Sequence, residues 1–140
     1  MMDQSVIFIF AGVIVVGAAF LGLICITKKG SKHLNVDQYR IKYLQIENSL
    51  RREEASSYHL SVLSADKLLD QALRESGVKG QTMGERMKNC NAKFSDANGV
   101  WNAHKLRNRI AHETDAPMNY EESRRAVANF KRALKDIGAI

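Results

Sequence analysis

The sequence predicts an all-α protein, with one modest helical domain and one additional apolar helix. Residues 36–76 contain neither Pro nor Gly, and their apolar residues recur three or four positions apart, as on one face of a helix. Helix-start patterns, in which a polar cap residue is followed three positions later by Glu, occur at 82–85 and 119–122. No segment alternates apolar and polar residues as a half-buried strand does, so we expect no sheet.

The N-terminal segment Val6 to Ile26 is an uninterrupted run of 21 uncharged residues. As a helix it would be about 31 Å long, which matches the hydrocarbon core of a bilayer. It lacks the basic start and the small-residue cleavage site of a secretory signal. We therefore predict a transmembrane anchor over residues 1–27, a juxtamembrane linker over 28–35 and a helical domain over 36–140.

The charges that flank this segment predict its orientation. Lys28, Lys29 and Lys32 follow the apolar run, whereas the short N-terminal flank carries Asp3 and no basic residue. Because positive charges are retained on the cytoplasmic side, the N-terminus is expected outside and the helical domain in the cytoplasm. The expected localisation is thus a single-pass membrane protein.

The first half of the helical domain has a helical pattern with an uncertain break. Residues 36–76 are compatible with two helices, or with one long helix that weakens near 51–57. Gly77 is well placed as the C-terminal cap of this stretch. After it, the capping pattern that begins at Thr82 predicts a short helix over 83–88.

Two further helices are expected in the second half, which makes a bundle of four or five helices. Ser95 or Asp96 can cap a helix that runs to about Glu113, and the only proline, Pro117, lies in the loop after it. The last helix begins near Asn119 and ends before Gly138. Its apolar stripe consists of Val127, Phe130, Leu134 and Ile137.

Residues 106–113 contain the polar pattern with the clearest chemical meaning. Arg107 precedes His112 by five positions, so the two lie roughly 140° apart around a helix, with Asn108 and His104 on the same arc. A guanidinium can hold a phosphate at two points, and an imidazole can transfer protons near neutral pH. The opposite, packing side of this helix is formed by Ala103, Leu106 and Ile110.

The stretch Arg107-Asn108-Arg109-Ile110-Ala111-His112 resembles the Arg-x-x-x-x-His signature of HEPN domains, small helical bundles found in many toxin and defence ribonucleases. The polar residue directly after the arginine is typical of the nuclease-type members. The resemblance extends more weakly over about Val36 to Ile140, because the helix pattern and the position of the motif before a last helix both fit. It implies metal-independent RNA cleavage by two motifs that face each other across a homodimer cleft.

The resemblance also implies a role for each motif residue. His112 would be the acid/base group that acts on the ribose 2′-hydroxyl or on the leaving oxygen. Arg107 would hold the scissile phosphate, and Asn108 would position the phosphate or the imidazole. His104 is added from helix geometry alone, as a residue that contacts the substrate.

Several other residues have both a structural and a functional interpretation. Arg124, Lys131 and Lys135 share one side of the last helix, which indicates a solvated face or a groove that binds the RNA backbone. Trp101 is expected near His112, as a core filler or the wall of a cleft. Arg109 and Glu113, four positions apart, are expected to form an ion pair with a structural role. Asp66 and Asp70, also four positions apart, can receive an arginine or form a dimer contact.

Composition excludes some classes of function. Residues 33–140 hold 18 Lys and Arg against 14 Asp and Glu, a net charge of +4 that is compatible with RNA but does not require it. Cys25 and Cys90 form no disulfide framework, and His104 and His112 have no third ligand, so neither a metal nor another cofactor is expected.

The alternative to a nuclease is a non-catalytic membrane-anchored module that binds RNA, nucleotide or a protein partner, and nothing in the sequence identifies an antitoxin.

Overall fold

The computed structural model describes residues 3–27, 33–113 and 115–140. The chain divides into two compact units, the first with helix α1 and the second with all later helices. The described residues form only helices, turns and irregular segments, which confirms the all-α prediction. Lys28, Lys29 and Lys32, on which the predicted orientation depends, lie outside the described residues.

Helix α1 (Gln4–Thr27) is apolar on every side. Its stretch Gln4–Leu23 is long and apolar enough to cross a membrane, and none of that stretch is buried. Phe8 and Phe20, for example, expose 75% and 68% of their surface. A helix without a polar face is stable in an apolar environment, so the length and composition of α1 agree with the predicted span Val6 to Ile26.

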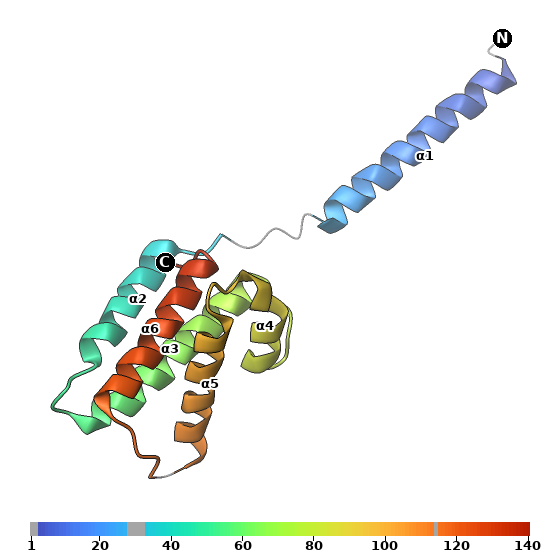
Figure 1. Cartoon of the computed structure of the whole chain (residues 1–140). Coiled ribbons are helices and arrows are strands. Elements are labelled where there is room, and N and C mark those ends of the chain that lie inside the picture. Colours follow the sequence, from blue (N-terminus) through green and yellow to red (C-terminus); the bar gives the residue numbers. More distant parts are fainter. Residues whose placement is uncertain (1–2, 28–32, 114) are drawn as a thin grey trace. The chain divides into compact units, whose positions relative to one another are not determined.

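The second unit is a bundle of five α-helices and one short 3-10 turn within its described residues. Figure 1 shows that α2 and α5 run in one direction and α3 and α6 in the other, with the short α4 between α3 and α5 in the chain. Helix α3 is central, because α2, α4, α5 and α6 all pack against it. The elements are α2 (Val36–Ser49), α3 (Ala55–Glu75), α4 (Met83–Cys90), η1 (Asn91–Lys93), α5 (Ala97–His112) and α6 (Tyr120–Asp136).

The stretch 36–76 forms two helices, which decides between the two alternatives left by the sequence. Ser57 stabilises the turn between them: its Oγ accepts from the Arg51 backbone N–H at 3.0 Å and donates to the Glu54 carbonyl at 2.7 Å. Ser49 Oγ also lies 3.1 Å from Ser61 Oγ, which ties the end of α2 to α3. Side-chain hydrogen bonds from serine thus replace helical backbone bonds at the break.

The core lies between α3 and α6, with contributions from the helices on either side. Val62, Leu69 and Leu73 of α3 are fully buried, as are Phe130 and Leu134 of α6. The predicted stripe of α6 is confirmed, since Val127 is also buried and Ile137 packs against this core from just beyond the helix end. Burial of these side chains is the main favourable contribution to folding of the unit.

Helices α4, α5 and α6 begin where the capping patterns predict. Thr82 Oγ1 accepts from the Glu85 N–H at 3.2 Å, and Asn119 Oδ1 accepts from the Glu122 N–H at 2.9 Å. Asp96, rather than Ser95, caps α5 by accepting from the Gly99 N–H at 2.8 Å. Each cap satisfies a backbone donor that has no partner within the helix.

Candidate functional site

A groove between α3, α5 and the start of α4 holds most of the chemically useful side chains of the bundle. We call it the polar groove; its volume is about 770 Å³. Asn108 lines it as well, together with the loop that contains Gln81. Its ionisable lining residues are Asp66, Lys67, Asp70, Arg86, His104 and Arg107.

Asp66 joins the two helices α3 and α5 that line this groove. Its side chain is only 5% exposed, and its two oxygens bind two different residues of α5. Oδ1 lies 2.7 Å from His104 Nδ1, and Oδ2 lies 3.2 Å from Arg107 Nε. A buried carboxylate is tolerated only when it is paired and hydrogen-bonded, so α3 and α5 are joined here through charge as well as through apolar packing.

A second ion pair, between buried Arg86 and partly exposed Asp70, also lines the groove. Asp70, one helical turn after Asp66, accepts from Arg86 of α4, whose Nε and Nη2 lie 2.7 Å from Oδ1. Arg86 Nη1 also donates to the Gly80 carbonyl at 2.6 Å. Asp66 and Asp70 each pair with an arginine, which is one of the two interpretations that the sequence left open. Arg86 itself was not expected, because an arginine in a short helix has no sequence pattern that indicates burial.

His104 is buried, although helix geometry placed it on the exposed polar arc. The reason is that α3 packs against this side of α5 and presents Asp66 to the ring. Because a carboxylate only accepts, Nδ1 carries the hydrogen of this bond. No hydrogen bond to Nε2 occurs among the described residues, and no buried side-chain nitrogen there lacks a partner. Nε2 is therefore not fully enclosed, and His104 is one of the residues that line the groove.

Trp101 belongs to the environment of His104. The two rings meet edge to face, with their centroids 6.2 Å apart, and Trp101 Nε1 donates to Asn91 Oδ1 at 3.0 Å. The expectation that Trp101 lies near His112 is not met, because the two residues are about three helical turns apart on α5. Trp101 packs against the core and restricts the position of the His104 ring.

Arg107 sits at the rim of the polar groove. Its side chain is 37% exposed, and its Nη1 donates to Asn108 Oδ1 at 3.0 Å. The ion pair between Nε and Asp66 Oδ2 and this hydrogen bond hold the guanidinium at two points. The remaining N–H donors of the Nη groups are available to a ligand in the groove, since an arginine has five donors in all.

His112 lies apart from this cluster. It is the last residue of α5, is exposed, and does not line the polar groove. Its ring makes no hydrogen bond or ion pair with the other described residues. Five positions of helix separate it from Arg107, about 7.5 Å along the axis. The structure thus brings Arg107, Asn108 and His104 together and leaves His112 at the helix end.

The remaining predicted binding residues face elsewhere. Arg124 pairs with Glu121 on its own helix, Nε to Oε2 at 3.0 Å. Lys131 lies 3.2 Å from Glu47 of α2, and its ammonium sits 4.9 Å from the centre of the Tyr43 ring. Neither side chain lines the polar groove. Lys131 joins α6 to α2, whereas the Arg124 pair lies within α6, so neither residue shares a groove with the motif.

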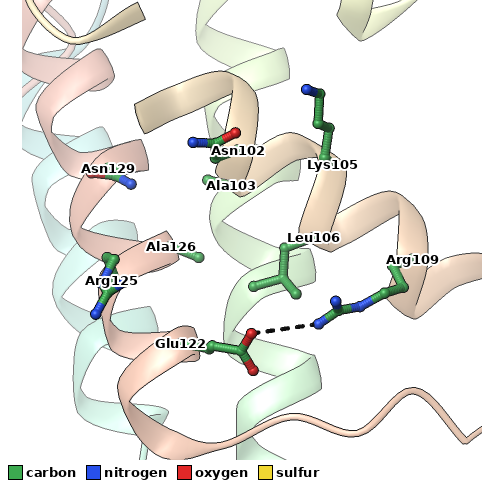
Figure 2. A pocket seen from close by; sticks show the side chains of 9 residues that line it. All are labelled: Asn102, Ala103, Lys105, Leu106, Arg109, Glu122, Arg125, Ala126 and Asn129. Carbon is green, nitrogen blue, oxygen red and sulfur yellow. Dashed lines mark ion pairs between the residues drawn. The ribbon is translucent and has the colours of Figure 1, made fainter. Parts of the chain in front are cut away.

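A second groove lies between α5 and α6 and uses a different face of α5. Figure 2 shows Arg109 reaching from α5 toward Glu122 of α6, with Leu106 between the helices. Arg109 Nη2 lies 3.7 Å from Glu122 Oε1, so the predicted partner Glu113 is replaced by a residue of the neighbouring helix. An ion pair this exposed contributes little to stability. The charged groups of this groove are surface side chains, unlike those around Asp66.

Metal and thiol chemistry find no support in the described residues. They contain no group of three His, Cys, Asp or Glu side chains that could hold a metal ion. Cys90 is buried, and this burial raises the pKa of its thiol, which disfavours the nucleophilic thiolate. Acid–base chemistry and anion binding at the polar groove remain the best-supported use of these side chains.

Comparison of the chain with protein-family models, curated proteins and solved structures finds no match.

Proposed function

We propose that this chain is a membrane-anchored, HEPN-like endoribonuclease that cleaves RNA without a metal ion, through Arg107 and His112 in the cleft of a homodimer. The observation that carries the proposal is the position of Arg107. Asp66 and Asn108 hold its guanidinium at the rim of a groove, and His112 follows at the exposed end of the same helix.

The role of Arg107 in this proposal is to bind the scissile phosphate. A guanidinium that is ion-paired through Nε with a carboxylate still has Nη donors for a ligand, which suits binding of phosphate oxygens. The negative charge on those oxygens increases as the phosphorus becomes five-coordinate. Donors that are already in place stabilise that charge without further reorganisation.

The role of His112 is proton transfer. Its exposure allows it to reach a bound RNA strand or the motif of a second copy. In the reaction the ribose 2′-oxygen loses its proton and attacks the adjacent phosphorus, and the bond to the 5′-oxygen breaks as that oxygen gains a proton. The products are a 2′,3′-cyclic phosphate and a free 5′-hydroxyl, and no water or metal is consumed in this step.

Helix α1 supplies the anchor in this proposal, with the N-terminus outside and the bundle in the cytoplasm. Confinement to a membrane raises the effective concentration of two copies, which favours the homodimer. A dimer in which the two α5 ends approach each other would place both exposed His112 rings beside one RNA strand.

A second candidate function is non-catalytic binding of RNA, nucleotide or a protein partner. It is favoured by the ring of His112, which has no orienting hydrogen bond among the described residues. Catalytic imidazoles are usually held by a partner on their second nitrogen. In this alternative, Arg107 and the polar groove form a recognition surface, and an antitoxin would be one possible protein partner.

The test is cleavage of a fluorescently labelled single-stranded RNA by the full chain in nanodiscs, with and without EDTA. We expect cleavage that is insensitive to EDTA and absent for DNA of the same sequence, which lacks the 2′-hydroxyl. His112→Ala and Arg107→Ala should each lower the rate about 10²–10⁴-fold. His33→Ala and Arg40→Ala are the matched controls, because both residues are exposed and lie outside the groove.

The outcomes separate the two functions. Cleavage that EDTA abolishes, or that survives both alanine substitutions, contradicts the proposed mechanism. Absence of cleavage together with RNA binding that Arg107→Ala weakens would favour the recognition module.

A further inference from the structure

We infer that His104 is a second imidazole that contacts the substrate, and that it accepts the proton of the ribose 2′-hydroxyl while Asp66 positions it. This inference rests on the proposed ribonuclease function and assigns the two proton transfers to different residues. His104 takes the proton from the attacking oxygen, and His112 supplies one to the leaving oxygen.

The first support is the state of the His104 ring. Nδ1–H donates to Asp66 Oδ1 at 2.7 Å, which leaves the lone pair of the neutral ring on Nε2. Nε2 has no hydrogen bond among the described residues and is not fully enclosed, and His104 lines the polar groove. A carboxylate that fixes the tautomer and direction of an imidazole, with the second nitrogen free to act, is the arrangement of a general base.

The second support is the shared carboxylate. Asp66 binds His104 through Oδ1 and Arg107 through Oδ2, so one rigid group sets the imidazole and the guanidinium relative to each other. These residues are three positions apart on α5, about 4.5 Å along the axis. In RNA the 2′-hydroxyl is adjacent to the phosphate that it attacks, so the base must lie beside the group that binds that phosphate. His104 meets this requirement more closely than His112 does.

The chemical step is balanced within these residues. The 2′-O–H bond breaks and its proton passes to His104 Nε2, while the 2′-oxygen forms a bond to phosphorus. The bond from phosphorus to the 5′-oxygen breaks, and that oxygen takes a proton from His112. Positive charge on the His104 ring is stabilised by Asp66, which keeps its own negative charge throughout.

A purely structural role explains the cluster less well. A buried ion pair is often no more stabilising than apolar residues of similar volume, because both charges lose their hydration. A histidine that only fills space and satisfies Asp66 has no reason to keep its second nitrogen open to a groove. The open nitrogen beside a half-exposed arginine therefore points to a ligand.

The decisive variant is His104→Asn in the full chain. The asparagine amide nitrogen takes the place of Nδ1 and can still donate to Asp66, but nothing replaces Nε2. We expect kcat to fall about 10²–10⁴-fold while KM for RNA changes little, since the phosphate contact remains. His59→Asn is the matched control, because His59 is half-buried outside the groove and its Nε2 lies 3.2 Å from the Ala116 carbonyl.

A modified substrate separates the two proton transfers. RNA with a bridging 5′-sulfur at the scissile bond has a leaving group that needs no proton. We expect this substrate to restore cleavage by His112→Ala but not by His104→Asn. If His104→Asn cuts ordinary RNA as fast as the parent, or if the sulfur substrate restores its activity, the inference is wrong while the ribonuclease proposal stands. A parent chain that cuts no RNA overturns both.

A measurement on the unaltered chain applies if His104→Asn does not fold. In ¹⁵N-histidine-labelled protein, a DNA strand serves as an uncleaved ligand. We expect the His104 Nε2 resonance to report an unprotonated nitrogen and to shift on DNA binding, with no shift for His59. A protonated Nε2 in the neutral ring, or no shift when DNA is bound, would overturn the inference.

Discussion

Position 66 shows how a single residue can connect two helices and a candidate site. Asp66 occurs on the face of α3 that is otherwise formed by Val62, Ala65 and Leu69, all of which are fully buried. A carboxylate at such a position loses its hydration, and it is compensated by a hydrogen bond from His104 and an ion pair with Arg107, both of α5. The contacts that stabilise Asp66 are therefore the same contacts that arrange the polar groove.

Replacement of Asp66 by alanine should destabilise the bundle. The change leaves His104 Nδ1 without an acceptor in a buried position, which we expect to cost roughly 1–3 kcal/mol in the free energy of unfolding. The part due to Arg107 is smaller, because that side chain is 37% exposed and water replaces its partner. Urea denaturation followed by the fluorescence of Trp101, the only tryptophan, measures the effect in the second unit.

Glu53→Ala is the control for that measurement, since Glu53 is exposed and no ion pair involves it among the described residues. Equal unfolding free energies for Asp66→Ala and Glu53→Ala would contradict the account of Asp66 as a buried partner of His104.

The Tyr39–Glu75 pair predicts a pH dependence of stability. Hydrogen bonds from Gln71 and from the Tyr39 hydroxyl, the latter 2.7 Å long, lower the pKa of Glu75 in the folded chain. The resulting stabilisation is complete above the ordinary pKa of a glutamate and is lost as pH falls through the lowered pKa of the folded state. Tyr39→Phe should therefore lower the unfolding free energy at neutral pH, with a difference that shrinks as the solution is acidified.

Tyr58→Phe provides the comparison. The Tyr58 hydroxyl donates to the Arg52 backbone carbonyl, which does not titrate, so its loss should cost the same at neutral and acidic pH. Unfolding measured at a series of pH values distinguishes the two variants. Parallel curves for Tyr39→Phe and the parent would show that Glu75 does not depend on Tyr39.

At the scale of elements, the start of α5 determines where the motif residues lie. Asp96 Oδ1 accepts from the Gly99 N–H at 2.8 Å, and Oδ2 accepts from Arg132 Nη1 of α6 at 2.7 Å. Gly99 is required by this cap, because a Cβ there would lie 2.4 Å from Asp96 Oδ2. The Gly99 carbonyl also accepts from Asn129 Nδ2 of α6 at 3.1 Å.

This geometry predicts coupling between positions 96 and 99. Asp96→Ala should cost about 1–2 kcal/mol as a lost N-cap. Gly99→Ala should destabilise the parent, because the new Cβ displaces the Asp96 carboxylate. In the Asp96→Ala background the same change should instead stabilise by up to about 1 kcal/mol, the helix propensity of Ala over Gly. A double-mutant cycle by urea denaturation measures the difference, and additive effects would contradict the proposed conflict.

At the scale of the whole molecule, α1 leads to a prediction about membrane integration. Because its uncharged stretch is long enough to span a bilayer, the full chain should resist extraction by alkaline carbonate. A reporter fused after Ile140 should be active only in the cytoplasm, and exchange of Lys28, Lys29 and Lys32 for Gln should weaken that bias. Release of the intact chain by carbonate contradicts the anchor, and a reporter active only outside contradicts the orientation.

The proposed homodimer predicts proximity of the two motifs. In a Cys25→Ser background, His112→Cys should form a disulfide with a second copy, because His112 is exposed at the end of α5. Arg40→Cys, exposed on α2, should cross-link far less at the same protein concentration. Equal cross-linking of the two variants, or a monomer by light scattering in nanodiscs, would count against a dimer through the motif.

Much of the fold follows from local patterns in the sequence. Thr82 and Asn119 start helices because their side chains accept from backbone groups three positions away, an interaction that needs no distant residue. The uncharged run in α1 and the stripe of Val127, Phe130 and Leu134 are equally local, since apolar spacing alone specifies them. The all-α class was predictable for this reason.

What only the tertiary structure decided concerns residues far apart in the chain. The helix pattern placed Arg107, Asn108 and His104 on one arc, but it could not show that α3 covers His104 or that Asp66 lies between His104 and Arg107. Similarly, Arg109 meets Glu122 of α6 rather than Glu113, because α5 ends at His112 and the backbone of Glu113 is extended rather than helical. Periodicity defines the faces of a single helix, whereas the pairing of buried charges depends on which faces meet.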